Sequence, residues 1–113
     1  MSDCVFCRIA QGEIPARYVH QDDDLVAFHD LAPQAPVHVL LIPRRHLASL
    51  ADCGDADGAL VGRLALVAAR LARELGLAGG WRLVANTGAD GGQSVGHLHF
   101  HLLGGRRLGW PPG

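Results

Sequence analysis

The segment that most constrains this fold is residues 96–103, GHLHFHLL, in which His97, His99 and His101 alternate with large apolar residues. In a β-strand alternate residues share one face, so the three imidazoles would lie on one side and the apolar chains on the other. A helix would scatter the same residues around its axis. We therefore expect a strand whose apolar face packs on the core. The histidine face is either a solvent-exposed polar surface or a functional site.

Two further segments predict strands, and a third predicts a strand pair. Residues 37–42 form an apolar, β-branched run typical of a buried strand, and residues 81–86 alternate as a strand does. Residues 17–29 predict two strands joined by an acidic turn at 22–24. With the histidine segment, these make five strands. Their short connections favour an antiparallel sheet.

One long helix is expected at residues 58–75, where apolar side chains recur with a period near 3.6. Asp57 is a plausible N-cap, and Gly76 suits the position just past the C-terminus. Residues 1–12 have a mildly helical pattern that ends at Gly12. The sequence therefore predicts an α+β fold with a five-stranded antiparallel sheet, one long helix and a short N-terminal helix.

Composition limits the class of protein. The 113 residues suit one domain spanning 1–113, with the glycine- and proline-rich residues 104–113 as a C-terminal tail. A formal net charge of −1 does not favour non-specific nucleic-acid binding. No apolar run is long enough for a membrane helix, and no signal-peptide pattern is present. We expect a cytoplasmic protein whose three cysteines are reduced thiols or metal ligands.

The histidines pose a choice between metal binding and catalysis. Along a strand, His97 and His101 would lie about 13 Å apart, too far to share one ion through bonds of about 2 Å. At least one ring is then left for nucleophilic or proton-transfer chemistry. The preceding loop, residues 90–94, has two glycines that could turn backbone N–H groups towards an anion, although a plain tight turn has the same composition. A phosphate cradle beside an imidazole suggests chemistry at phosphorus.

Residues 97–103 match the H-φ-H-φ-H-φ-φ signature, with φ apolar, of the histidine triad (HIT) superfamily. The resemblance covers essentially the whole chain. Residues 9–16, 27–46, 86–105 and 110–113 resemble the HINT branch. This resemblance implies a HIT fold, and a homodimer in which one sheet continues across the interface.

The resemblance also implies an enzyme, a nucleotide phosphoramidase. It would hydrolyse the P–N bond of purine nucleoside phosphoramidates (AMP or GMP amides) through a covalent nucleotidyl-histidine. By motif position His99 would be the nucleophile, with its other ring nitrogen held as a donor by a backbone carbonyl. His101 would contact the phosphate, His38 would support proton relay, and Ser94 would lie near the leaving amine.

The same resemblance places the nucleotide. Asp30 would bind the ribose hydroxyls, although it could equally be a turn residue before Pro33. Trp110 would reach the partner subunit's site, or simply anchor the tail. An apolar base slot would be formed by Phe6, Ile9, Phe28 and Leu31, for which a core role is the alternative. The remaining phosphate contacts would come from Asn86, Gly92, Gln93, Ser94, His99 and His101.

The N-terminal C-x-x-C pair departs from the commonest HINT pattern. In other superfamily members such a pair binds structural zinc together with two histidines, and the matching set here is Cys4, Cys7, His46 and His97. Two thiolates and two imidazoles suit tetrahedral zinc. Redox-active or merely buried thiols are the alternatives. No organic cofactor is expected, and the sequence assigns no role to Cys53, His20 or His29.

Three other functions stay open from the sequence. One is a dinucleoside polyphosphate hydrolase of the same superfamily. Another is a nucleotide-binding or scaffold protein with incidental catalysis. The third is a metallohydrolase in which zinc activates water, and it differs from the covalent-histidine scheme in predicting that chelation abolishes activity.

Overall fold

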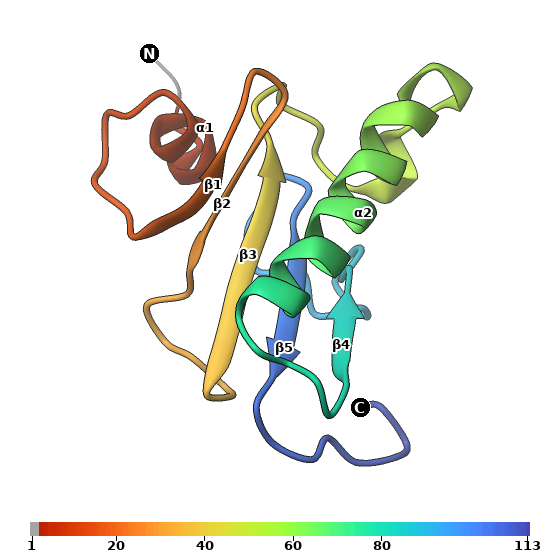
Figure 1. Ribbon diagram of the computed structural model, residues 1–113. Coiled ribbons are helices and arrows are strands. Elements are labelled where there is room, and N and C mark those ends of the chain that lie inside the picture. The colour runs from red at the N-terminus through yellow and green to blue at the C-terminus, as the bar shows by residue number, and fades with distance from the viewer. Residues whose placement is uncertain (1–2) are drawn as a thin grey trace.

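The computed structural model describes residues 3–113 as one antiparallel sheet with helices on both of its faces (Figure 1). The strands are β1 (Tyr18–Gln21), β2 (Leu25–His29), β3 (Val37–Pro43), β4 (Trp81–Val84) and β5 (Phe100–Gly104). Their order is β1-β2-β3-β5-β4, so β5 lies between β3 and β4. The two helices of more than one turn are α1 (Val5–Ala10) and α2 (Gly58–Glu74), and two short 3-10 helices, η1 (Leu50–Asp52) and η2 (Asp55–Asp57), precede α2. The predicted fold class is confirmed.

Helix α2 covers one face of the sheet because its apolar stripe matches the apolar face of the central strands. The buried side chains Leu64, Val67 and Leu71 pack with Leu102 of β5 and Leu41 of β3 in the main core cluster. The chain leaves the helix at Leu75, and Gly76 follows with a φ of +76°, a conformation that glycine adopts without steric cost. The predicted helix is thus confirmed to within one residue.

The opposite face of the sheet carries α1 and the histidines. Leu40 and Ile42 point to this face from β3, where they form a second, smaller core with Phe6 and Ile9 of α1. His38 points to the same face, because it lies two residues before Leu40 on β3. Alternation along β3 therefore separates a purely apolar face under α2 from a face that is apolar under α1 and polar beyond it.

The histidine segment is only partly a strand. β5 begins at Phe100, opposite Leu41 of β3, so His97 and His99 precede the ladder. The β3 ladder ends near Pro43, which has no N–H to donate, and Leu98 instead donates to the Leu47 carbonyl at 2.6 Å. The predicted separation of faces nevertheless holds, because Leu98, Phe100 and Leu102 all join the α2 core.

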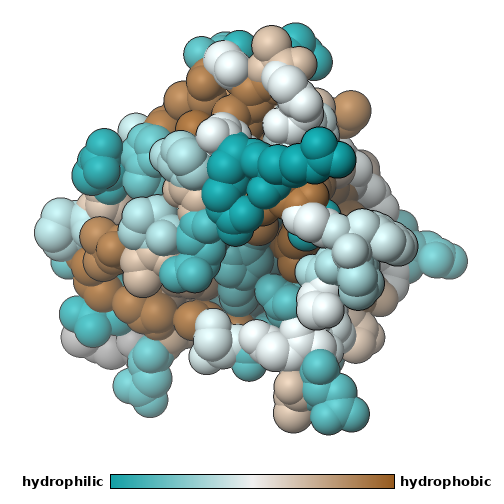
Figure 2. Space-filling view, turned by 90° about the horizontal axis from the view of Figure 1, so that it is seen from below, coloured by the Kyte–Doolittle hydropathy of each residue, from teal (hydrophilic) through white to brown (hydrophobic). Residues whose placement is uncertain are grey.

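No helix within residues 3–113 has the length and apolarity needed to cross a membrane. At the end of the sheet where β5 finishes, strongly hydrophilic side chains gather across the middle of the surface (Figure 2). This end brings together the loop before β3, the loop before β4 and the tail that follows β5 (Figure 1).

Candidate active site

The three histidines of the motif lie on the sheet face opposite α2, and they diverge into two clusters. His97 is 0% exposed and His99 is 3% exposed, whereas His101 is partly exposed. The ring of His99 sits edge-on between Phe6 and His101, with centroid separations of 5.1 and 4.9 Å. His97 turns towards the N-terminal cysteines and His101 towards His38 of β3. His97 and His101 therefore belong to different clusters of side chains, and the functions assigned to them stay predictions.

His99 has a defined tautomer. Its Nδ1 lies 2.7 Å from the carbonyl oxygen of His97, and a carbonyl can only accept a hydrogen bond. Nδ1 therefore carries the hydrogen and donates. In the neutral ring this leaves the lone pair on Nε2, which is the state that a nucleophile requires.

His38 and His101 are also fixed, through a backbone amide. The N–H of Gln34 donates to Nδ1 of His38 at 3.0 Å, so in His38 the hydrogen resides on Nε2. This Nε2 lies 2.9 Å from Nδ1 of His101 and donates to it. His101 in turn carries its hydrogen on Nε2. His38 thus donates to His101 in this arrangement, and the relay role that the resemblance implies for this ring stays a prediction.

Burial keeps these two imidazoles neutral. Desolvation, together with the neighbouring rings of His99 and His38, lowers the pKa of His101 from 6.5 to about 4. Desolvation also lowers the pKa of His38, although the carboxylate of Asp30 opposes this shift. At neutral pH His101 is therefore a neutral hydrogen-bond donor and not an imidazolium.

Asp30 lies beside this pair at the start of the loop before β3. One carboxylate oxygen accepts from the Ala32 amide at 2.8 Å, and the other lies 3.4 Å from Nε2 of His38. Potential donor atoms of Asp30, His38 and His101 lie within 4.8 Å of one another, close enough to be considered for a metal. However, the hydrogen on His38 Nε2 points at His101, so that nitrogen has no lone pair for a cation. The arrangement favours a hydrogen-bonded chain.

The second cluster has the composition of a metal site. Sγ of Cys7 lies 3.2 Å from Nδ1 of His46 and 3.5 Å from Nδ1 of His97. Sγ of Cys4 lies 3.3 Å from Nδ1 of His97, and the two Nδ1 atoms are 3.1 Å apart. All four predicted ligands therefore converge from α1 and its N-cap residue, from the segment after β3 and from the segment before β5.

These spacings fit a tetrahedral ion. Bonds of about 2.0–2.3 Å to zinc separate ligand atoms by roughly 3.3–3.8 Å at the corners of a tetrahedron. The Nε2 of His97 donates to the Pro43 carbonyl at 2.9 Å, which leaves the lone pair on the Nδ1 that faces the thiols. Burial lowers the pKa of His97, which also favours the neutral ring that a metal requires. The four residues can hold a metal ion.

The loop between β4 and β5 is tightly braced. Gln93 accepts from the Gly88 amide and donates to the carbonyls of Ala48 and Val95, so its side-chain amide is used within the fold. Asn86 donates to the Gly91 carbonyl at 2.7 Å. These two side chains, predicted as phosphate contacts, hold the backbone of the loop in shape.

Glycine is required in this loop for two reasons. A Cβ at Gly91 would lie 2.3 Å from the Thr87 carbonyl oxygen, and Gly92 has a φ of +77°. Ser94 is exposed and precedes His97 by three residues. The loop thus presents Gly92 and Ser94 at the surface.

The residues predicted for the base slot divide into two groups. Phe6, Ile9 and Phe28 are buried in the smaller core, with Phe6 touching the ring of His99. Leu31 is 96% exposed. Trp110, predicted to reach the partner subunit's site or to anchor the tail, is 85% exposed. His20, to which the sequence assigned no role, lies between Asp22 and Arg70 as part of a surface hydrogen-bond network.

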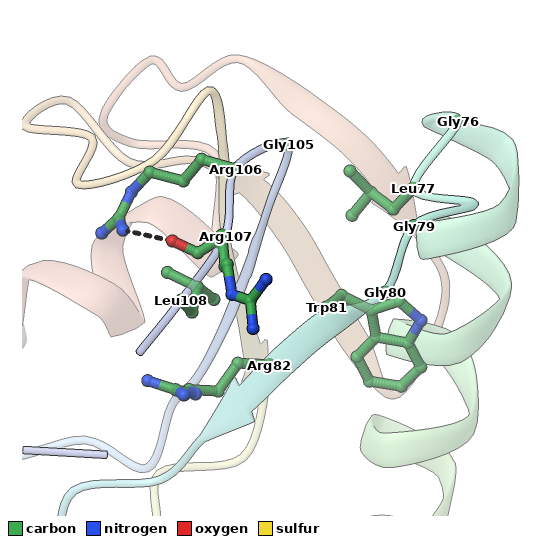
Figure 3. Close-up of a pocket in the computed structure, with 10 residues that line it drawn as sticks. All are labelled: Gly76, Leu77, Gly79, Gly80, Trp81, Arg82, Gly105, Arg106, Arg107 and Leu108. Carbon is green, nitrogen blue, oxygen red and sulfur yellow. Dashed lines mark hydrogen bonds between the residues drawn. The ribbon is translucent and has the colours of Figure 1, made fainter. Parts of the chain in front are cut away.

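A groove at the end of the sheet was not anticipated from the sequence. It is lined by the loop before β4, by the first residues of β4 and by the start of the tail, and Arg82, Arg106 and Arg107 are among its lining residues (Figure 3). Arg82 donates to the Gly109 carbonyl and Arg106 donates to the carbonyls of Gln34 and Arg107. Two of the three guanidinium groups therefore serve backbone carbonyls of the fold.

The HIT domain family matches residues 11–108. An uncharacterized HIT-like protein of Synechococcus elongatus is 51% identical over 98% of this chain and 97% of its own length. A HIT family hydrolase from Legionella pneumophila has a solved structure with a TM-score of 0.97, at 50% identity over 98% of this chain and 100% of that one. A histidine triad protein from Clostridium difficile has a TM-score of 0.93, at 44% identity over 96% of both chains. The chain belongs to the HIT family.

Proposed function

We propose that this protein is a hydrolase that cleaves the P–N bond of purine nucleoside phosphoramidates through a nucleotidyl-His99 intermediate. The observation that carries the proposal is the 2.7 Å contact from His99 Nδ1 to the His97 carbonyl, which leaves Nε2 as the nucleophilic atom. The similarity to a HIT family hydrolase supports a hydrolytic reaction.

The chemistry follows from the groups around His99. Nε2 attacks the α-phosphorus, the P–N bond breaks, and the amine departs after taking up a proton from solvent, which the attacking water returns in the next step. Water then attacks the phosphorus of the adduct, which releases the nucleoside monophosphate and restores the imidazole. His101, as a neutral donor through Nε2–H, would stabilise charge on a phosphate oxygen, and Ser94 would lie near the amine.

For the nucleoside, we propose that Asp30 accepts hydrogen bonds from the ribose hydroxyls and that Phe6, Ile9, Phe28 and Leu31 contact the base. The short helix α1 places Phe6 against both His99 and Phe28, which supports an apolar wall next to the nucleophile. The backbone around Gly92, held by Asn86 and Gln93, would face the phosphate.

The Cys4–Cys7–His46–His97 cluster would bind one structural zinc ion. Its support is the convergence of four donor atoms at tetrahedral spacing. When bound, zinc would fasten α1 to the segments that flank the triad. Metal removal should therefore lower stability rather than remove the nucleophile.

We further propose a cytoplasmic homodimer in which β4 of each copy extends the sheet. Strand β4 is an edge of the sheet and so has unpaired backbone groups on its outer side. The exposed Trp110 of the tail would then reach the second copy. Sedimentation velocity tests this assembly, and a monomer at all concentrations would contradict it.

The deciding experiment measures hydrolysis of adenosine 5'-phosphoramidate by the wild type and by His99→Ala, with mass spectrometry of the quenched protein. We expect turnover and a trapped AMP–protein adduct in the wild type, and a loss of about 10³-fold or more in the variant. His29→Ala, at the end of β2, is the matched control and should retain activity. Equal turnover by His99→Ala would refute the proposal, and a preference for diadenosine polyphosphates would favour the related hydrolase.

A further inference from the structure

Residue 34 joins the C-terminal tail to the candidate active site through its two backbone groups. Its carbonyl oxygen accepts from Nε and Nη2 of Arg106, at 3.2 and 3.0 Å. Its amide donates to Nδ1 of His38 at 3.0 Å. Neither contact depends on the side chain of Gln34, which donates to the Ala32 carbonyl.

The direction of hydrogen bonding is set along this whole chain of groups. A backbone amide can only donate, so Nδ1 of His38 must accept, and Nε2 of His38 must then donate to Nδ1 of His101. If His38 instead carried its hydrogen on Nδ1, that hydrogen would face the Gln34 amide and His101 would lose its donor. One backbone amide thus determines the tautomers of two imidazoles.

The loop that carries this amide is held from outside the site. Gly105 has a φ of +90°, and a Cβ there would lie 2.9 Å from Cβ of Pro36, so the turn after β5 packs closely on the loop. This approach brings the side chain of Arg106 back over Gln34. Arg106 also donates to the Arg107 carbonyl, as the dashed line in Figure 3 shows.

We propose that the Gln34 backbone and Arg106 are positioning elements of the active site. Arg106 holds the Gln34 carbonyl, and the Gln34 amide fixes His38 and His101 in the tautomers that place a hydrogen on Nε2 of His101. Arg106, at the start of the C-terminal tail, therefore determines which nitrogen of His101 donates. This inference deepens the proposed function, since it concerns how the phosphate donor of that reaction is prepared.

The first test compares Arg106→Ala with Arg107→Ala in the full chain. Both variants remove one positive charge from the same groove, and within residues 3–113 the Arg107 side chain makes no hydrogen bond or ion pair. The readout is ¹⁵N NMR of the imidazoles, because bare and hydrogen-bearing ring nitrogens have widely separated shifts. We expect Nε2–H in His38 and His101 for the wild type and for Arg107→Ala, and a mixture of tautomers for Arg106→Ala.

The second test removes the amide itself. Gln34→Pro lacks the N–H, whereas Gln34→Ala keeps it and alters only the side chain. We expect mixed tautomers in the proline variant and wild-type tautomers in the alanine variant. Should Gln34→Pro fail to fold, the Arg106 pair decides the question alone.

Activity gives an independent readout of the same inference. For Arg106→Ala we expect kcat to fall about tenfold relative to Arg107→Ala with little change in KM, a smaller loss than the 10²–10³-fold cost of deleting a donor outright. Hydrogen on Nδ1 of either ring in the wild type, or identical tautomers in Arg106→Ala and Arg107→Ala, would overturn the inference. Because the NMR result needs no substrate, failure of the proposed phosphoramidase reaction would be distinguishable from failure of this inference.

Discussion

Replacing His101 with Asn should make folding stability less sensitive to acid. In the wild type, protonation of His101 requires a proton on the Nδ1 that accepts from His38, and His38 cannot reverse because its own Nδ1 accepts from Gln34. Desolvation and the rings of His99 and His38 add to this cost, and together they place the pKa of His101 at about 4 against 6.5 for an ordinary histidine. Asn presents an oxygen that can accept from His38 but does not titrate.

The magnitude follows from proton linkage. Above about pH 6.5 neither the folded nor the unfolded chain is protonated at this ring, so it contributes nothing to pH dependence. Between about pH 6.5 and pH 4 the unfolded chain binds a proton that the folded chain does not, and stability falls as the pH falls. For pKa values of 6.5 and about 4, the loss by pH 5 is about 2 kcal/mol, and it levels off below about pH 4.

Urea unfolding of both proteins at about pH 7.5, 6 and 5 measures this difference. Titrating groups that do not contact His101, such as His97, act in both proteins and cancel when the two pH dependences are subtracted. We expect the wild type to lose about 2 kcal/mol more than His101→Asn between pH 7.5 and pH 5. Losses that agree within about 0.5 kcal/mol, or an NMR titration midpoint of His101 near 6.5, would refute the reasoning.

Three further results are expected. Cys7→Ser should bind less zinc than the one ion per chain expected for the wild type, and its Tm should be lower. Its activity per folded molecule should stay within about twofold of the wild-type activity. Loss of activity in the folded variant would instead favour zinc-activated water. Gly91→Ala should raise KM about tenfold, because the added methyl meets the Thr87 carbonyl and shifts the loop; an unchanged KM would mean that the loop does not contact phosphate. Leu102→Ala, at a site with 0% exposure, should cost about 2–5 kcal/mol of unfolding free energy in urea, while Leu66→Ala, at 73% exposure, should stay within about 0.5 kcal/mol.

Much of the fold was predictable because its segments have simple periodicities. Period-2 alternation located β4 and the histidine segment, an apolar run located β3, and an acidic turn located the β1–β2 pair. The 3.6-residue period located α2 between Asp57 and Gly76. The residue at which β5 begins could not be predicted from the sequence. Its ladder begins at Phe100 because pairing depends on where β3 ends, and no local pattern around His97 and His99 records the position of Pro43.

The candidate metal cluster was predicted only through the resemblance to the HIT family. Spacing identified the Cys4–Cys7 pair, but His46 and His97 lie 39 and 90 residues from Cys7 along the chain. Their convergence depends on how the segments after β3 and before β5 meet α1. That meeting is a property of sheet order, which a single sequence does not display.

The sequence by itself determined which side chains were present and which face of the sheet each would occupy, because strand and helix periods are local properties of the chain. It supplied three histidines on one face, a C-x-x-C pair and a glycine-rich loop. Only the tertiary structure decided the state of each ring. The His97 carbonyl determines which nitrogen of His99 carries hydrogen, and the Pro43 carbonyl does the same for His97. The Gln34 amide determines it for His38. These are backbone groups, identical at every position but proline, so only their placement in space gives them this role.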